Sequence, residues 1–376
     1  RKIKAINDKD FALALRLREE EKAAAAETAA DKYTAVLTEK DIAEVVTSYT
    51  GIPVSCDDDK AKKLAELEKI LSAKITGQTA AISAIANAVR RGRSGLSDEH
   101  RPTGSFIFLG TSGVGKTKCC KELARALFGD EKALIRFDMS EYSEKHSVSK
   151  LIGAPAGYVG YEDGGKLIDR VRRAPYSVVL FDEIEKAHPD IFDILLQVLD
   201  DGHLTDSAGR TADFTNTVII MTGNIGSRLI SGGKNKLGFG TQQRQSAISE
   251  LIRNELKEYF RPEFLGRVDE VIVFNELGMS DYKQICGNML SELAERCKRQ
   301  GIALSWSERL SDRICAEAEK MHEGARPIAK LIDKNVMNCI SDGIINGEFS
   351  DGDEIYADVS ESGGYTVKRL CADKLG

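Results

Sequence analysis

Residues 110–117 read G-x-x-x-x-G-K-T and constrain the fold more than any other part of this sequence. They follow the apolar run 105–109, which predicts a strand, and they open a helical segment at Lys116. Such glycines let backbone N–H groups surround phosphates, and Lys116 can reach the outer phosphate oxygens while Thr117 offers a hydroxyl to Mg²⁺. The predicted nucleotide-binding residues here are Gly110, Thr111, Ser112, Gly113, Val114, Gly115, Lys116 and Thr117.

Strand and helix patterns alternate around this motif. Apolar, β-branched runs predict strands at residues 105–109, 133–137, 178–181 and 217–222. Helical spacing follows Lys116 and covers residues 189–199, where Pro189 occupies the first turn. This alternation predicts an α/β fold in which helices flank a mostly parallel sheet.

Polar residues follow two of the predicted strands. Asp182 and Glu183 come directly after residues 178–181, and downstream of a phosphate-binding loop they suggest the second half of a nucleotide-hydrolysing site. Asp182 can hold Mg²⁺ through water, and Glu183 can polarise an attacking water molecule. Two acids at a strand end also fit an ordinary solvated terminus. Asn224 fits either a turn or an amide placed near that water.

The sequence divides into three predicted regions. Residues 1–60 are a charged helical arm followed by a linker, and residues 61–275 form the large nucleotide-binding unit. Residues 276–376 form a smaller, mostly helical unit. We expect it to end in a β-hairpin with strands at 354–359 and 365–367.

Composition narrows the functional classes. Lys and Arg total 53 against 59 Asp and Glu, and this net charge of −6 argues against binding nucleic acid through overall positive charge. The apolar runs are strand-sized, far below the roughly 20 residues of a membrane span. The eight scattered cysteines predict reduced thiols in a cytoplasmic protein, without a structural metal. Because Arg1 is followed by no apolar leader, we expect a piece of a longer protein without a signal peptide.

Several longer motifs resemble the second ATPase module of Clp-type AAA+ unfoldases, most closely the ClpC group. The resemblance covers nearly the whole chain and runs through TGIPV at 50–54, DMSEY at 138–142, FDEIEKAHP at 181–189 and RPEFL at 261–265. It implies an AAA+ P-loop NTPase fold, with ATP and Mg²⁺ as cofactors. It also implies that Ile52, Pro53 and Val54 contact the nucleotide.

The resemblance assigns roles to single polar residues. It implies that Asn224 and Arg326 sense the nucleotide and that Arg267 completes the site of a neighbouring subunit; on chemical grounds a guanidinium suits the charge of a transferring phosphoryl group. For either arginine considered alone, a surface ion pair is the ordinary alternative. The sequence departs from the family pattern at Gly223, where the family has Ser, and at Gly266, where it has Asn. Gly266 precedes Arg267 and is expected to loosen its position.

A glycine-rich stretch around Tyr158 resembles the loop that lines the central pore of Clp ATPases. A tyrosine flanked by glycines can grip an extended polypeptide through apolar area without reading its sequence. The predicted pore residues are Gly157, Tyr158, Val159 and Gly160. The ordinary alternative is that the aromatic residues pack beneath the loop.

Residues 226–246 are polar and glycine-rich, which predicts a long loop. Leu237, Gly238 and Phe239 within it resemble the segment with which ClpC and ClpA proteins bind the ClpP peptidase. Two apolar side chains on such a loop suit docking into a hydrophobic pocket. Alternatively, Leu237 and Phe239 fold back onto their own domain.

Together these features predict an ATP-dependent protein unfoldase that assembles as a homo-hexamer and delivers unfolded or tagged proteins to ClpP. Part of residues 1–30 resembles a ClpC adaptor-binding motif, so an adaptor is a further expected partner, whereas nucleic acid and membranes are not. Two alternatives stay open: a ClpB-like disaggregase that works without a peptidase, and a nucleotide-gated scaffold with incidental turnover. A DNA-directed motor is disfavoured by the charge and by the lack of a base-stacking platform.

Overall fold

The computed structural model describes residue 19 and residues 37–50, 57–95, 98–153, 165–226, 251–252, 254–360 and 363–370. The chain divides into two compact units, Arg1–Asp57 and Asp58–Gly376. In the first unit, helix α3 (Glu39–Thr50) begins with a capping box formed by Thr38 and Asp41. The amide of Asp41 donates to Oγ1 of Thr38 at 3.4 Å, and the amide of Thr38 donates to the Asp41 carboxylate at 2.7 Å.

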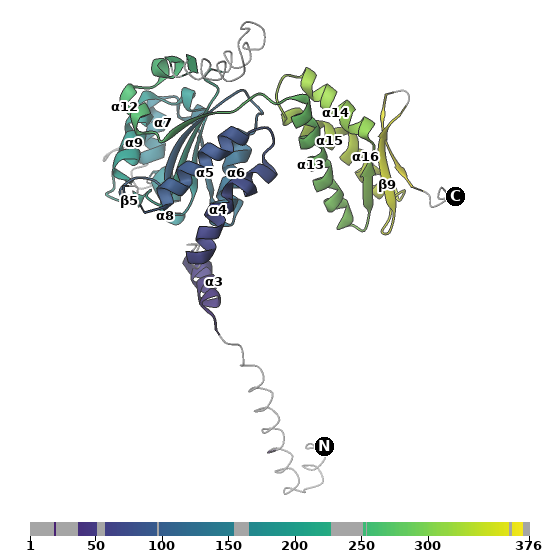
Figure 1. Ribbon diagram of the computed structural model, residues 1–376, viewed down its shortest axis with the longest axis horizontal. Coiled ribbons are helices and arrows are strands. Elements are labelled where there is room, and N and C mark those ends of the chain that lie inside the picture. The colour runs from purple at the N-terminus through teal and green to yellow at the C-terminus, as the bar shows by residue number, and fades with distance from the viewer. Residues whose placement is uncertain are drawn as a thin grey trace. The chain divides into compact units, whose positions relative to one another are not determined.

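A five-stranded parallel sheet organises the second unit (Figure 1). Its order is β2-β3-β6-β1-β7, which places β1 between β6 and β7. The strands are β1 (Gly104–Leu109), β2 (Leu134–Asp138), β3 (Val178–Asp182), β6 (Val218–Gly223) and β7 (Glu270–Val273). The predicted α/β class is thus confirmed, with four of these strands where the sequence indicated them. β7 was not predicted, because its four residues owe their conformation to distant pairing with β1.

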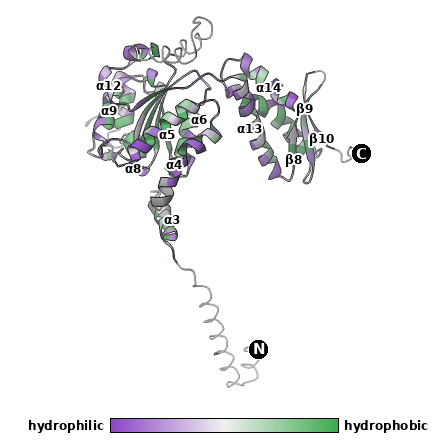
Figure 2. Ribbon diagram, viewed as in Figure 1, coloured by the Kyte–Doolittle hydropathy of each residue, from purple (hydrophilic) through white to green (hydrophobic). Residues whose placement is uncertain are grey.

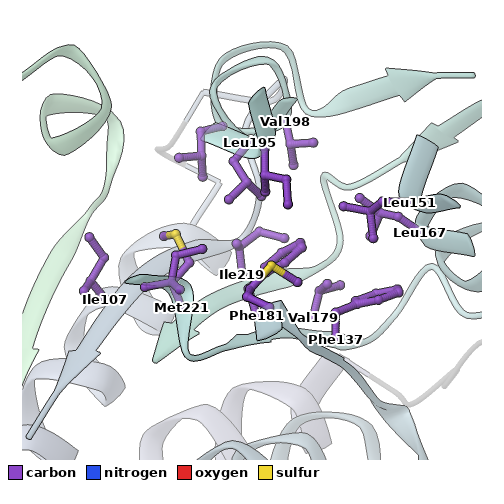
Figure 3. Packing of buried hydrophobic residues seen from close by; sticks show 14 of the residues in the cluster. Ile107, Phe137, Leu151, Leu167, Val179, Phe181, Leu195, Val198, Ile219 and Met221 are labelled. Atoms are coloured by element: carbon purple, nitrogen blue, oxygen red, sulfur yellow. The ribbon is translucent and has the colours of Figure 1, made fainter. Parts of the chain in front are cut away.

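Helices cover both faces of this sheet. Alternate β1 residues join separate cores: Ile107 packs on the face of α7, α8, α9 and α12, whereas Phe106 and Phe108 pack on that of α4, α5 and α6. The helices are α4 (Asp57–Lys74), α5 (Thr79–Arg93), α6 (Lys116–Phe128), α7 (Lys145–Ile152), α8 (Lys166–Arg173), α9 (Pro189–Asp201) and α12 (Pro262–Arg267). Figure 2 shows apolar positions where the helices meet the sheet, and Figure 3 shows Phe181 and Ile219 packed beneath Leu195.

Short elements connect these layers. Helix α9 has its predicted start, because Nδ1 of His188 accepts from the amide of Asp190 and Pro189 occupies the first turn. A small hairpin after α9 was not predicted, since its strands have only three residues each. The short elements are β4 (His203–Thr205), β5 (Thr211–Asp213), η1 (Glu131–Ala133), η2 (Met139–Tyr142) and η3 (Ile184–Lys186).

The C-terminal part of the second unit has its own apolar core, built from residues between Tyr282 and Ala357. Its elements are α13 (Met279–Lys298), β8 (Ala303–Trp306), α14 (Glu308–Lys320), α15 (Arg326–Ile332), η4 (Asp333–Met337), α16 (Asn338–Ile345), β9 (Glu354–Val359) and β10 (Tyr365–Arg369). The predicted hairpin is β9–β10. A third strand, β8, pairs parallel to β9 and was not predicted. The boundaries at 60/61 and 275/276 remain predictions.

Gly202 fixes the end of α9, and this position gives a test of the fold. It adopts φ +63°, and an added Cβ would lie 2.0 Å from the carbonyl oxygen of His100. We expect Gly202→Ala to lower the free energy of unfolding by at least about 3 kcal/mol, because backbone strain and a backbone clash add together.

Gly209 is the matched control: its φ is +79°, yet a Cβ there meets nothing within 4 Å. Gly209→Ala should cost only about 1 kcal/mol. Equal shifts of the urea midpoint would contradict the close packing at His100.

Candidate nucleotide-binding site

The loop between β1 and α6 has the geometry that phosphate binding requires. Gly110, Gly113 and Gly115 all have positive φ, which other residues rarely adopt. Gly115 precedes α6 and no side chain caps that helix, so the amides of its first turn face the loop without a protein side-chain acceptor. These amides and the helix dipole favour an anion at this position.

Lys116 lies across this loop. Its Nζ donates to the carbonyl oxygen of Gly110 at 2.5 Å and to Oδ1 of Asn224 at 3.0 Å. Burial lowers the pKa of the Lys116 ammonium to about 8, although the carboxylates of Glu185 and Asp182 act in the opposite direction. The charged form of Lys116 is therefore destabilised by burial, and a bound anion would stabilise it.

Asp182 is buried at the end of β3 and is held from two sides. Nη2 of Arg136, on the neighbouring strand β2, lies 2.6 Å from Oδ2 of Asp182. The hydroxyl of Thr222, on β6, donates to Oδ1. These partners stabilise the charged carboxylate and fix its direction.

Glu183, the next residue, has φ +57° and ψ +50°, an uncommon backbone conformation for a residue with a side chain. Its amide donates weakly to Oγ1 of Thr222 at 3.4 Å, and its carboxylate lies 2.5 Å from Nζ of Lys186. The turn directs Glu183 toward the same space as Asp182. Its ion pair raises the pKa of Lys186.

Asn224 follows β6, the strand between β1 and β3. Besides the side-chain contact with Lys116, the backbone N–H of Asn224 donates to Oε1 of Glu185 at 3.1 Å. An added Cβ at Gly223 would lie 3.0 Å from Oε2 of Glu185, so this carboxylate fills the space beside the glycine. Asn224 is thereby held between the phosphate-binding loop and the strand that ends in Asp182.

Arg326 reaches the site from the C-terminal part of the unit. The amide of Ala325 donates to the carbonyl oxygen of Gly113 at 3.0 Å, and the two loops touch through glycines. An added Cβ at Gly113 would lie 2.1 Å from the carbonyl oxygen of Glu323, and one at Gly324 would lie 2.6 Å from the carbonyl carbon of Gly113. This approach brings the charge of Arg326 close enough to act on Lys116.

The predicted residues meet around one cavity of about 460 Å³. Among its lining residues are Ser112, Gly113, Gly115, Lys116, Thr117, Asp182, Glu183, Asn224 and Arg326. Cations, open amides and two carboxylates on one cavity suit a phosphorylated ligand with a divalent cation. Gly110, Thr111 and Val114 belong to the same loop without lining this cavity; the carbonyl of Thr111 accepts from Lys116 at 3.1 Å, and Val114 is buried.

Arg267 has a different location. It ends α12, and its Nε lies 2.9 Å from Oδ1 of Asp200. Arg267 is not among the described residues that line the cavity. Seven predicted loop residues, Gly157, Tyr158, Val159, Gly160, Leu237, Gly238 and Phe239, lie outside the described residues, as do Ile52, Pro53 and Val54.

Several residues of the site were not singled out from the sequence. Thr222 and Arg136 fix Asp182, and the buried amide of Gln78 donates to the carbonyl oxygens of Val114 and Asn275. The one available signal was Arg136, a cation inside an otherwise apolar strand. Thr222 and Gln78 depend on contacts between distant segments and gave no comparable signal.

This fold and this cavity define a P-loop nucleoside triphosphatase of the AAA+ class. Comparison with known families agrees: residues 101–271 match the AAA domain (Cdc48 subfamily), and residues 277–357 match the C-terminal D2-small domain of ClpB protein. These two matches together span more than half of the chain.

Curated relatives make the assignment narrower. The chain is 47% identical over 346 residues to the ATP-dependent Clp protease ATP-binding subunit ClpA homolog of Porphyra purpurea, with 90% of this chain and 42% of that protein covered. It is 48% identical over 326 residues to the ATP-dependent Clp protease ATP-binding subunit ClpC of Staphylococcus aureus (strain USA300), with 86% of this chain and 40% of that protein covered. It is also 47% identical over 344 residues to Chaperone protein ClpC1, chloroplastic, of Oryza sativa subsp. japonica, with 90% of this chain and 38% of that protein covered.

The chain therefore belongs to the Clp family of AAA+ ATPases and resembles the C-terminal part of ClpC, as the sequence motifs predicted. It spans about two fifths of the length of these relatives. No helix among the described residues combines the length and apolar character that crossing a bilayer would take.

The lowered pKa of Lys116 predicts a pH-dependent nucleotide affinity. Above pH 8 the free site loses the ammonium charge, and a bound triphosphate must restore it by proton uptake. We expect the Kd of a non-hydrolysable ATP analogue to rise between pH 8 and pH 9.5, by at most about tenfold per pH unit. Calorimetry in buffers of different ionisation enthalpy should detect the proton.

Lys116→Arg is the matched control for this titration, because a guanidinium keeps its charge throughout the range. Its affinity for the analogue is expected to be weaker but nearly constant from pH 8 to 9.5. A wild-type affinity that is equally constant would contradict the assignment of the titration to Lys116.

Proposed function

We propose that this chain is an ATP-driven unfoldase module that works as a homo-hexamer and passes polypeptide through a central pore to the ClpP peptidase. The observation that carries the proposal is the cavity shared by Lys116, Asp182, Glu183, Asn224 and Arg326. A binding protein without turnover needs the lysine and the loop. Nucleotide binding alone does not require the second carboxylate, Glu183, whereas hydrolysis uses such a group to activate water.

ATP hydrolysis follows from the chemistry of these side chains. Lys116 and the loop amides hold the phosphates, and Glu183 accepts a proton from the water whose oxygen attacks the γ-phosphorus as ADP leaves. Asn224 orients this water, and Arg326 stabilises the charge that moves onto the leaving oxygen. Lys116, Asp182, Glu183, Asn224, Arg267 and Arg326 form the proposed catalytic set.

Magnesium fits this donor set through the hydroxyl of Thr117 and water molecules held by Asp182. Among the described residues, no three His, Cys, Asp or Glu side chains converge on a metal site. Mg²⁺ keeps several waters and binds through one or two protein oxygens plus substrate phosphates, and Thr117 and Asp182 can supply such oxygens. When bound, it would neutralise charge on the β- and γ-phosphate oxygens.

The position of Arg267 supports assembly. Its side chain is half exposed and pairs with Asp200 rather than lining its own subunit's cavity. An arginine supplied by a neighbouring subunit would make hydrolysis depend on ring formation. We therefore propose that Arg267 completes the site of the next subunit in the hexamer.

The partner assignments rest on sequence and on relatives. Proteins from Porphyra purpurea and Staphylococcus aureus carry the name ATP-binding subunit of the ATP-dependent Clp protease, which supports a peptidase partner. Tyr158 remains the proposed gripping residue, and Leu237 with Phe239 the proposed ClpP contact. Unfolded or tagged proteins as substrates, a possible adaptor and a cytoplasmic location also remain proposals. The match to the D2-small domain of ClpB keeps a peptidase-independent disaggregase as the second candidate.

Glu183→Gln separates binding from hydrolysis. Removing the carboxylate should lower the rate of phosphate release at least about 100-fold, because an amide cannot accept the water proton. The Kd for ATP should change less than about threefold, since the phosphate-binding groups are intact. Lys116→Ala serves as the contrasting variant, with both quantities impaired. Parent-like phosphate release by Glu183→Gln would remove Glu183 from the mechanism.

The two loops distinguish unfoldase, disaggregase and scaffold. Light scattering of Glu183→Gln with ATP and ClpP should give a ring–peptidase complex, and Leu237→Ala with Phe239→Ala should abolish it. Tyr158→Ala should keep at least half of the phosphate release while losing unfolding of a tagged fluorescent protein. A hexamer that ignores ClpP but extracts aggregated protein would favour the disaggregase, and assembly with ATP but without substrate unfolding would favour the scaffold.

A further inference from the structure

The side chain of Arg267 is held by an acidic residue of another helix. Nε of Arg267 lies 2.9 Å from Oδ1 of Asp200, in the last turn of α9. Among the described residues, this Oδ1 is shielded from solvent and accepts no aligned hydrogen bond. The guanidinium of Arg267 therefore supplies the positive charge that compensates it.

Arg101 fixes the backbone beside both members of this ion pair. Its Nε donates to the carbonyl oxygen of Leu199 at 3.1 Å, and its Nη2 donates to the carbonyl oxygen of Arg267. One guanidinium thus ties the end of α9 to the end of α12. These two hydrogen bonds fix the distance between the backbone at Leu199 and the backbone at Arg267, independently of the contact between the Asp200 and Arg267 side chains.

The flanking segments are also fixed. Gly202 approaches His100 so closely that no Cβ fits, which anchors the end of α9. After Arg267, the carboxylate of Asp269 accepts from the amide and the hydroxyl of Ser105, at 2.8 and 2.7 Å. Asp200 therefore extends from a rigid support.

α12 itself offers less support. It has six residues, and Gly266 within it leaves open space where a side chain would be. A glycine inside a helix costs about 1 kcal/mol relative to alanine. The direction of the Arg267 side chain must therefore be set from outside the helix.

We propose that Asp200 is a positioning residue that orients the guanidinium of Arg267 toward the nucleotide of the neighbouring subunit. Among the described residues, Arg267 forms an ion pair between its Nε and Oδ1 of Asp200, and we infer that the two terminal nitrogens of the guanidinium are the ones that reach phosphate oxygens. Holding a charged group in its reactive geometry before the transition state saves reorganisation. The inference rests on the proposed trans action of Arg267.

The ion pair is well suited to a clean substitution. The Arg267 side chain is 49% exposed and that of Asp200 is 29% exposed. Although Oδ1 of Asp200 itself is shielded, both side chains reach solvent, and ion pairs of such partly exposed side chains contribute little to stability. Asp200→Asn keeps the shape of the side chain and removes its charge, so we expect the fold and the hexamer to persist.

Steady-state kinetics give the first readout. Asp200→Asn in all subunits should lower kcat for ATP at least about fivefold, with KM changed less than twofold, because Arg267 acts on the nucleotide after binding. Asp200→Glu should retain more of the kcat than Asp200→Asn, since it keeps the charge. Unchanged kcat, or equal losses in both variants, would overturn the proposal.

Mixed rings then show which subunit Asp200 serves. Glu183→Gln subunits have an intact Arg267, and Arg267→Ala subunits have an intact Glu183, so mixing the two inactive proteins should restore hydrolysis at their shared interfaces. Asp200→Asn added to the Glu183→Gln subunits should cut the restored rate at least about fivefold. The same substitution added to the Arg267→Ala subunits should leave the restored rate within about twofold.

Each result of the mixing experiment has one meaning. Equal loss from both placements would indicate a general structural role for Asp200 and overturn the proposal, as would no loss from either. If the mixture of Glu183→Gln and Arg267→Ala subunits recovers no hydrolysis, the proposed trans action of Arg267 is wrong. The positioning role of Asp200, which depends on it, is then wrong as well. Recovery that ignores Asp200 would overturn the positioning role alone.

Asp193 provides a matched control on the same two elements. It also lies on α9, and its Oδ1 pairs at 2.9 Å with Nη1 of Arg261, directly before α12. Asp193→Asn on the Glu183→Gln subunits should leave the restored rate within about twofold. A fivefold loss from this variant would show that any ion pair between α9 and α12 has the same effect, and would overturn the specific role of Asp200.

Discussion

The parallel pairing of β1, β6 and β3 is the constraint on which the site depends. Leu109 pairs with Gly223 and Phe181 pairs with Met221, so the three strands end at one edge of the sheet. Gly110, Asn224 and Asp182 are the residues at or just beyond these ends. A slip of one residue in any pairing would turn a site residue toward the opposite face. The buried side chains on both faces of the sheet therefore fix the chemistry as well as the fold.

Because the strand ends bring charged side chains close together, each buried charge needs a partner of opposite charge or a hydrogen bond. Asp182 receives Arg136 from one side and Thr222 from the other, and Lys116 is held by carbonyls and by Asn224. Lys116 has no salt-bridge partner among the ion pairs of the described residues, and burial lowers its pKa. The protein thus compensates the carboxylate itself but leaves the lysine to be compensated by a ligand, which is the asymmetry expected of a site for a polyanion.

The sequence predicted those parts of this arrangement that are local. The loop 110–117 has its own spacing, and residues 178–183 are an apolar run that ends in acids, so both could be placed without a structure. β7 could not be predicted, because its four residues become a strand through pairing with β1 more than 160 positions away. Thr222 was part of a predicted strand, but nothing in its neighbours indicates that its hydroxyl meets Asp182. The roles of Asn224, Arg267 and Arg326 came from the family resemblance, because a polar residue after a strand, or a lone arginine, is chemically ambiguous.

Helix α9 relates the cavity to Arg267 within a single subunit. It begins six residues after Glu183 and ends beside Asp200, which pairs with Arg267. A helix is stiff along its axis, so movement of the segment that carries Asp182 and Glu183 must either deform the apolar contacts of Leu195 and Val198 or move the end of α9. The close packing of the core resists deformation of the contacts of Leu195 and Val198. Helix α9 and the Asp200–Arg267 ion pair therefore connect the segment that carries Asp182 and Glu183 to Arg267 within the chain.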